Sequence, residues 1–229
     1  MTTFRRYAIY YVPANDGLAE FADRWLGWSA RKGAFVDPLE VAGLSLPLAE
    51  ITEAPRKYGF HATLKPPFRL ADTSTEDRLI ADCARLATSH FRVEVGQLAL
   101  TRLGRFLALT VSDEGNALQD LAAALVTGLD LHRRPMSEEE RERRASPMHS
   151  ARQIELLNTW GYPFVLDQFR FHMTLTGKLR KADLVTTEAV LRKAIEPLIN
   201  LPTEIDSFCL CGEDAQGFFN VLKRFDLAG

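Results

Sequence analysis

The candidate reactive side chains of this sequence come from two copies of one short motif. The first copy is Phe60-His-Ala-Thr-Leu64 and the second is Phe171-His-Met-Thr-Leu175. The histidine and the threonine of the second copy each lie 111 residues after those of the first. Because side chains alternate between the two faces of a strand, each histidine shares a face with the threonine that follows it. Each copy therefore presents an imidazole and a hydroxyl on one face and apolar side chains on the other.

The polar residues of the two motifs suit the hydrolysis of a phosphodiester; they are His61, Thr63, His172 and Thr174. This reaction needs a base that activates the nucleophile and an acid that protonates the leaving oxygen. Imidazole titrates near neutral pH, so one neutral and one protonated histidine can fill both roles, and the sequence leaves open which is which. Threonine hydroxyls can donate hydrogen bonds to the phosphoryl oxygens in the transition state. Neither histidine has a second ligand at a spacing typical of zinc sites, so we expect no metal and no cofactor.

Strand alternation adds candidate substrate-binding residues beside the motifs. Lys65 is expected on the face of the first motif's polar residues, and Arg170 and Thr176 on that of the second. Cations at these positions could bind a further phosphate of the substrate, or they could simply reach solvent at the strand ends. Tyrosines that could line the site, with orientations that the pattern leaves open, are Tyr10, Tyr11 and Tyr58.

The elements that position the motifs form two similar units. Apolar runs bounded by Gly and Pro predict strands at residues 5–12, 58–65, 91–95, 106–111, 169–176, 203–211 and 218–225. A helical pattern follows each motif, so the order strand–helix–strand–strand occurs twice. Pro66 and Pro67 are expected to end the first motif's strand or to leave it at a sheet edge.

A charged segment interrupts the two units at residues 132–146. Its pairs Glu139–Arg143 and Glu140–Arg144 have the i, i+4 spacing that supports an exposed helix, which could act as a lid. Direct contact of Arg133 or Arg134 with substrate is the alternative. Ser146-Pro147 is expected to open a further helix that Gly161 closes.

Composition limits the classes of function. The 28 Lys+Arg against 30 Asp+Glu give a net charge of −2, which argues against a duplex nucleic acid partner. The sequence has no run of 18 apolar residues and no signal-peptide pattern, so we expect a cytoplasmic protein without a membrane partner. The three cysteines, Cys83, Cys209 and Cys211, are expected to be reduced thiols. The oligomeric state stays open.

The paired H-x-T motifs resemble those of the two-histidine phosphoesterase superfamily, and more narrowly a family of phosphonate-metabolism proteins within it. The segments that carry the resemblance are Arg6–Pro13, Tyr58–Pro67 and Trp160–Gly177. The resemblance implies a bilobal α+β fold, with two antiparallel sheets lining a central cleft and helices outside. It also implies that His61, Thr63, His172 and Thr174 are catalytic. We expect one domain with lobes at residues 1–112 and 161–229, joined by a linking helix and the charged insertion at 113–160.

These observations predict an enzyme that hydrolyses a small cyclic phosphodiester of a sugar or nucleotide. The family's description favours a ribose cyclic phosphate. The first alternative is processing of RNA 2′,3′-cyclic phosphate ends, which uses the same chemistry but favours a basic protein. The second is a non-catalytic module that binds a phosphorylated ligand. Two histidines argue against that module, because arginine or lysine would serve binding equally well.

Overall fold

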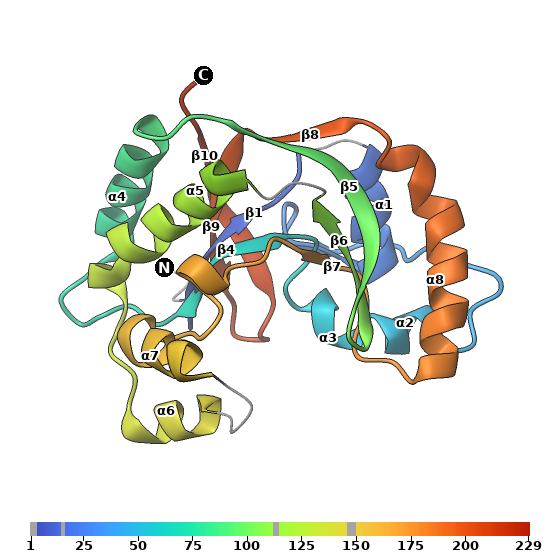
Figure 1. Ribbon diagram of the computed structural model, residues 1–229, viewed down its shortest axis with the longest axis horizontal. Helices are drawn as coiled ribbons and strands as arrows, with labels where there is room; N and C mark the ends of the chain where they lie inside the picture. The colour runs from blue at the N-terminus through green and yellow to red at the C-terminus, as the bar shows by residue number, and fades with distance from the viewer. Residues whose placement is uncertain (1–3, 15–16, 112–114, 146–149) are drawn as a thin grey trace.

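One curled antiparallel sheet of eight strands organises the molecule (Figure 1), in a computed structural model that describes residues 4–14, 17–111, 115–145 and 150–229. The order across the sheet is β10-β9-β1-β4-β7-β6-β5-β8. The strands are β1 (Tyr7–Tyr11), β4 (Ala62–Phe68), β5 (Val93–Leu103), β6 (Phe106–Val111), β7 (Met173–Thr174), β8 (Pro202–Ile205), β9 (Ser207–Glu213) and β10 (Phe219–Asp226). A small second sheet pairs β2 (Trp28–Ser29) with β3 (Ala34–Phe35). The expected α+β class is confirmed, with the two expected sheets present as halves of one sheet joined where β4 pairs with β7.

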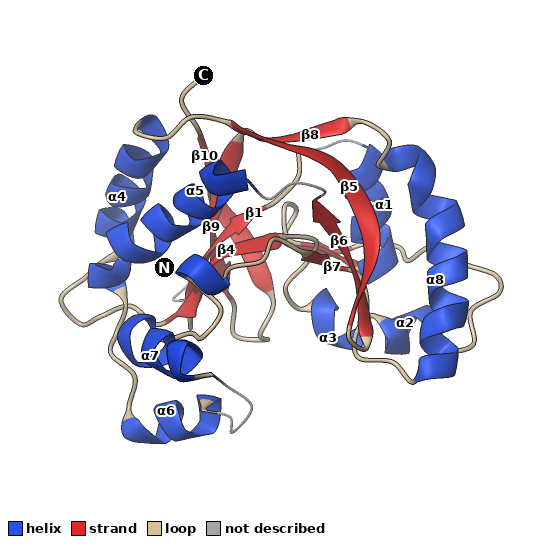
Figure 2. Cartoon of the chain, viewed as in Figure 1, coloured by secondary structure: helices blue, strands red, loops and turns tan. Residues whose placement is uncertain are grey.

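Helices flank both halves of the sheet, with α4 and α5 on one side of the view and α1 and α8 on the other (Figure 2). Their bounds are α1 (Gly17–Leu26), α2 (Leu48–Ile51), α3 (Glu53–Arg56), α4 (Glu76–Thr88), α5 (Gly115–Gly128), α6 (Glu138–Arg144), α7 (Ala151–Trp160) and α8 (Lys181–Ile195). Short 3₁₀ turns occupy Asp130–His132, Leu166–Gln168 and Glu196–Leu198. None of the described helices has the length and apolar composition needed to cross a bilayer.

The main hydrophobic core lies on one face of the sheet. It contains the apolar residues of both motifs, such as Phe60 and Met173, together with buried residues of α1, α4, α5 and α8. A smaller buried cluster lies on the opposite face of β1 and β9 and includes Tyr10 and Phe219. The predicted alternation in the motifs is therefore present, with apolar side chains on the helix-covered face.

The two motif strands differ from their predicted lengths. β4 continues through Pro66 and Pro67, which were expected to end it or to leave it at a sheet edge, and it lies between β1 and β7 in the sheet. The β1–β4 register shifts at the prolines, which tolerates the missing N–H donors. β7 is restricted to Met173–Thr174 rather than residues 169–176. On either side of β7, backbone carbonyls bond to side chains instead of to a neighbouring strand. The His172 ring bonds to the Arg170 carbonyl oxygen, and the Trp25 indole donates to the Leu175 carbonyl oxygen.

The strand order does not follow the expected division at residues 112 and 161. One half of the sheet combines β1 and β4 with the C-terminal β9 and β10, and the other combines β7 with β5, β6 and β8. The hairpin that follows each motif in the sequence thus lies in the half of the other motif. Strand pairing, rather than proximity along the chain, decides which strands make up each half of the sheet.

The charged insertion folds as expected into an exposed helix, α6, which packs beside α7 at one end of the molecule (Figure 1). Its ion pairs are Arg141–Glu138 and Arg143–Glu140, at i, i+3 rather than the predicted i, i+4 spacing. Gly161 ends α7 in a left-handed conformation, as predicted. The predicted opening at Ser146-Pro147 lies outside the described residues, and Ser150 caps the described start of α7.

Candidate active site

The two motifs meet at the centre of the sheet. Ala62 of β4 pairs with Met173 of β7 in antiparallel register. Extending that register by one residue in each direction sets His61 opposite Thr174, and Thr63 opposite His172. Directly opposed side chains in such a pair have Cβ atoms roughly 5 Å apart. The fold thus brings all four predicted catalytic residues onto one patch, related by an approximate twofold axis between the strands.

Both histidines are oriented by the same backbone contact. The Nδ1 atom of His61 lies 2.9 Å from the Gly59 carbonyl oxygen, and that of His172 lies 2.9 Å from the Arg170 carbonyl oxygen. A carbonyl only accepts, so Nδ1 carries a proton in each ring and Nε2 is left for chemistry. In His61, the Thr63 hydroxyl donates to Nε2 over 3.1 Å. A neutral His61 is therefore held in the tautomer that a general base requires.

The surroundings of the two histidines differ at one equivalent position. β1 and β6 flank the motif strands similarly, since Tyr10 pairs with Thr63 and Ala108 pairs with Thr174. The buried Tyr10 ring lies over the His61 ring, with centroids 3.9 Å apart. Ala108 offers His172 no such cover. The two motifs are alike in sequence, but an aromatic ring lies beside His61 where only a methyl group lies at the equivalent position beside His172.

This asymmetry affects the titration of His61. Burial lowers the pKa of His61 to about 4, because desolvation disfavours the imidazolium. The hydrogen bond to Gly59 opposes this shift, and the nearby His172 adds to it. At neutral pH His61 is therefore uncharged, and its Nε2 carries no proton.

Lys65 does not lie on the face of His61 and Thr63, which corrects the prediction. Tyr10 pairs with Thr63 but Ile9 pairs with Lys65, so β4 has one extra residue and the alternation reverses. Lys65 is buried on the helix-covered side, where its Nζ donates to the Val126 carbonyl over 2.7 Å.

The other predicted binding residues, Thr176, Arg170 and Tyr58, differ in where their side chains lie. Thr176 is buried, and its hydroxyl accepts from the Leu107 amide and donates to the Gly177 carbonyl, so it holds the chain rather than a ligand. The exposed Arg170 side chain donates to the Phe169 carbonyl. Tyr58 lies beside the motif, with its ring centroid 6.0 Å from that of His61. Strand alternation could not decide which tyrosine lines the site. In the structure, the Tyr10 ring is in direct contact with the His61 ring.

The described residues contain no cluster of three His, Cys, Asp or Glu side chains suited to a metal ion. The three cysteines are buried and unpaired with one another. Burial raises the pKa of Cys83 to about 12 and that of Cys209 to about 11, so neither is a reactive thiolate near neutral pH.

Comparisons with known proteins connect the chain to a family model and to longer proteins of phosphorus metabolism. The family model described as "Protein of unknown function (DUF1045)" matches residues 63–220. A relative named ribose 1,5-bisphosphate phosphokinase PhnN, from Janthinobacterium sp. (strain Marseille), is 34% identical over 93% of this chain and 48% of its own length. A protein of the same name from Laribacter hongkongensis is 32% identical over 78% of this chain and 42% of its own. The chain spans about half the length of these relatives.

Solved structures with a similar course of the chain include E. coli LigT complexed with NADP+ and TT0787 of Thermus thermophilus. LigT has a TM-score of 0.48 at 15% identity, with 100% of both chains covered. TT0787 has a TM-score of 0.46 at 17% identity, with 98% of both chains covered.

Proposed function

The chain belongs to the DUF1045 family, and we propose that it hydrolyses a small cyclic phosphodiester with His61 and His172 as its base and acid. One observation carries the proposal: two H-x-T motifs face each other across the β4–β7 pair, each histidine opposite the other motif's threonine. A phosphorus atom between them would have an imidazole on either side. That is the arrangement an in-line displacement at phosphorus requires.

In the proposed reaction, the neutral His61 Nε2 takes a proton from water as the water oxygen bonds to phosphorus. The ester P–O bond breaks on the opposite side, and protonated His172 gives its Nε2 proton to the leaving sugar oxygen. The product is a phosphate monoester, and proton exchange with solvent restores both rings. Thr63 and Thr174 donate hydrogen bonds to the non-bridging oxygens, with Thr63 exchanging its contact to His61 for one to the substrate.

The substrate class proposed is a sugar cyclic phosphate. The two named relatives are described as acting on ribose 1,5-bisphosphate, a sugar with two phosphate groups, which supports a ribose phosphate scaffold. Their kinase activity belongs to proteins about twice as long. This sequence has no G-x-x-x-x-G-K-[S/T] segment, the loop that cradles phosphates in many phosphoryl-transfer enzymes.

A turnover assay by phosphorus NMR tests the proposal with a ribose 1,2-cyclic phosphate and a nucleoside 2′,3′-cyclic phosphate. His61→Ala and His172→Ala should each reduce kcat by roughly 10²–10⁴-fold, the range typical of acid–base groups. Thr63→Ala and Thr174→Ala should cost less. His90→Ala is the matched control, because His90 binds the Leu86 carbonyl at the end of α4, away from the motifs. Binding of cyclic phosphates without turnover by the wild type would instead favour the binding module.

A further inference from the structure

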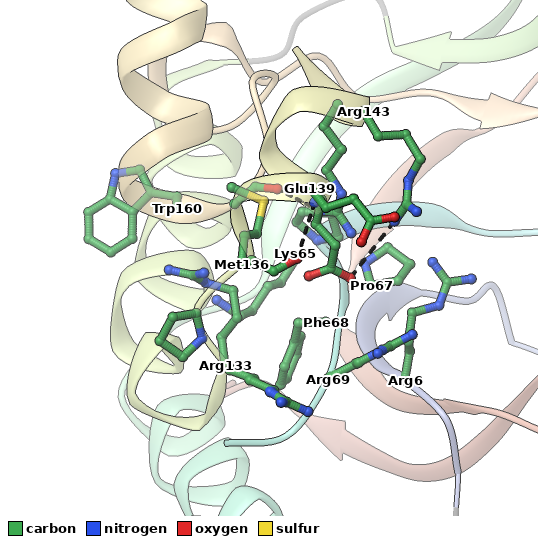
Figure 3. Close-up of a pocket in the computed structure, with 17 residues that line it drawn as sticks. Arg6, Lys65, Pro67, Phe68, Arg69, Arg133, Met136, Glu139, Arg143 and Trp160 are labelled. Atoms are coloured by element: carbon green, nitrogen blue, oxygen red, sulfur yellow. Dashed lines mark hydrogen bonds and ion pairs between the residues drawn. The ribbon is translucent and has the colours of Figure 1, made fainter. Parts of the chain in front are cut away.

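A cavity of about 690 Å³ with an unusual excess of positive charge lies where the ends of β1 and β4 meet the charged insertion (Figure 3). Among the described residues, seven Lys and Arg side chains and only two Glu side chains line it. The arginines come from separate segments and surround the space from different sides, as Arg6, Arg69, Arg133 and Arg143 show in Figure 3. In a chain of net charge −2, such convergence marks a site for an anion.

Part of this charge is already neutralised within the protein. Arg6 makes two hydrogen bonds of 2.6 Å to Glu213, and Arg133 binds Asp130 through two nitrogens. Lys65 lies 3.8 Å from the same Asp130 carboxylate. Arg6, Arg133 and Lys65 therefore line the pocket, but acidic residues of the protein already compensate their charges.

The remaining arginines of the pocket are less fully compensated by acidic residues within the part of the chain that the structure describes. No ion pair there involves Arg69, Arg134 or Arg144, and Arg143 is 3.9 Å from Glu140. Arg144 is half-buried, and among the described residues its side chain donates to the Gly161 carbonyl. Burial lowers the pKa of its guanidinium; Glu140 opposes this effect, while Arg6 and Arg143 add to it by repulsion.

Strand register brings two of these like charges together. Tyr7 pairs with Phe68, so the next residues outward, Arg6 and Arg69, lie opposite each other. Directly opposed like charges destabilise an antiparallel pair. Glu213 already compensates the charge of Arg6, so a bound dianion here would chiefly compensate Arg69.

A chain of side-chain contacts links the pocket to the proposed reacting centre. The Arg6 guanidinium lies 5.7 Å from the centroid of the Phe219 ring, and Phe219 contacts Tyr10, whose ring covers His61. A second route runs from Arg144 to Tyr162, which interacts electrostatically with both Arg144 and Tyr58. Arg6 also shares a face of β1 with Tyr10. Pro66 and Pro67, which line the pocket, follow Thr63 along β4, so the pocket and the first motif lie along one strand.

We propose that this arginine pocket binds a second, non-reacting phosphate monoester on the same sugar whose cyclic phosphodiester reacts at His61 and His172. The proposal rests on the proposed function and specifies its substrate as a doubly phosphorylated sugar. Guanidinium groups bind a phosphate dianion through paired hydrogen bonds. The cations converge on one volume of ordinary small-molecule size, and Glu139 and Glu140 at its wall disfavour an extended polyanion.

The test compares two sugar cyclic phosphates that differ only in a phosphate monoester at the far end of the sugar. The wild type should have at least a tenfold higher kcat/KM for the compound with the extra phosphate. Arg69→Gln and Arg144→Gln should each reduce that preference by roughly tenfold, with kcat/KM for the plain cyclic phosphate unchanged. Arg144→Gln also removes the hydrogen bond to the Gly161 carbonyl at the end of α7. Among the described residues, Arg69 makes no hydrogen bond to α7, so Arg69→Gln tests the pocket without disturbing that helix. Arg78→Gln on exposed α4 is the matched control and should retain the full preference.

A binding measurement separates this proposal from the proposed function. Calorimetry with ribose 5-phosphate, which has no cyclic ester, should show binding to the wild type and to His172→Ala, and at least tenfold weaker binding to Arg69→Gln and Arg144→Gln. If ribose 5-phosphate binds in this way but no cyclic phosphate is turned over, the proposed pocket is supported and the proposed reaction is contradicted. Equal turnover of both cyclic phosphates by the wild type, or ribose 5-phosphate binding that neither substitution weakens, would overturn the pocket. So would a preference for RNA 2′,3′-cyclic ends that these variants lose.

Discussion

Tyr10 is one side chain that distinguishes the surroundings of the two motif histidines. Both imidazoles are anchored through Nδ1 to the carbonyl two residues before them, so their tautomers are set in the same way. The Tyr10 and His61 ring centroids are 3.9 Å apart, whereas the equivalent neighbour of His172 is Ala108 and the Phe106 ring centroid lies 6.2 Å from that of His172. A general base has to be neutral at the working pH, and desolvation keeps His61 in that form.

Removing the ring of Tyr10 should shift the pH dependence of the reaction. With the pKa of His61 lowered to about 4, wild-type kcat/KM should fall only as the pH drops through about 4, where the base becomes protonated. Tyr10→Ala admits water and should raise the pKa toward the ordinary value of about 6.5. The acidic limb of the rate profile and the NMR titration of His61 should then both move to higher pH.

Tyr10→Phe is the matched control for this shift. The Tyr10 hydroxyl is buried and has no hydrogen-bond partner among the described residues, so its removal breaks no contact. The phenylalanine variant should keep the wild-type profile. Identical profiles for the alanine variant and the wild type would show that Tyr10 does not set the pKa of His61.

The turn before β4 positions the first motif through its backbone. Gly59 has a φ of 71°, and a Cβ there would lie 2.7 Å from the Cβ of Ala30. Its carbonyl also orients His61. The conformation that glycine permits is therefore tied to the placement of the proposed base.

Gly59→Ala should both destabilise the protein and reduce turnover. The strained φ costs roughly 1 kcal/mol, and the contact with Ala30 should add to that loss in the free energy of unfolding measured in urea. Gly104→Ala is the control, because Gly104 has a similar φ of 62° with nothing within 4 Å of its added Cβ. That variant should lose about 1 kcal/mol and keep its kcat. Equal stability losses and equal kcat for the two variants would contradict a special role of Gly59.

The extra residue in β4 gives Lys65 a structural role. Its ammonium group satisfies the Val126 carbonyl of α5 and lies near Asp130, which Arg133 also binds. Lys65→Met should therefore lower the free energy of unfolding by roughly 1–3 kcal/mol, the cost of leaving a buried acceptor unsatisfied. Because Lys65 faces away from His61, kcat for a plain cyclic phosphate should stay within about twofold of wild type. A large loss of kcat in a stably folded variant would return Lys65 to the reacting centre.

The two halves of the molecule depend on each other through the course of the chain. β8 and β9 are separated only by Asp206, yet β8 forms one end of the sheet order and β9 lies next to its other end. The sheet must therefore curl to bring its ends together. Each half also contains strands from distant parts of the sequence, so neither can be completed by a continuous piece of chain.

This interleaving predicts that the expected lobe 1 is not an independent folding unit. A fragment of residues 1–112 would lack β9, β7 and α5, which cover β1, β6 and β4. It should show the far-UV dichroism and amide exchange of an unfolded chain, while the full protein unfolds in one transition seen equally by tryptophan fluorescence and dichroism. A fragment with a cooperative transition of its own would show that the lobes are separable.

Local patterns were enough to find the motif residues, the α+β class and the exposed charged helix. A strand's alternation and a helix's repeat are properties of neighbouring residues, and the repeated H-x-T pentapeptide needed no tertiary information. The pairing of hairpins with the opposite motif, the reversal of Lys65, the cover that Tyr10 gives to His61 and the convergence of Arg6, Arg69 and Arg144 came only from the folded chain. The physical reason is that register, bulges and charge clusters depend on which distant segments pack together. One inserted residue before Lys65 turns that side chain to the other face, and a second register shift before Phe68 turns the alternation back. The periodicity of a single strand does not reveal where such shifts occur, because they depend on the partner strand.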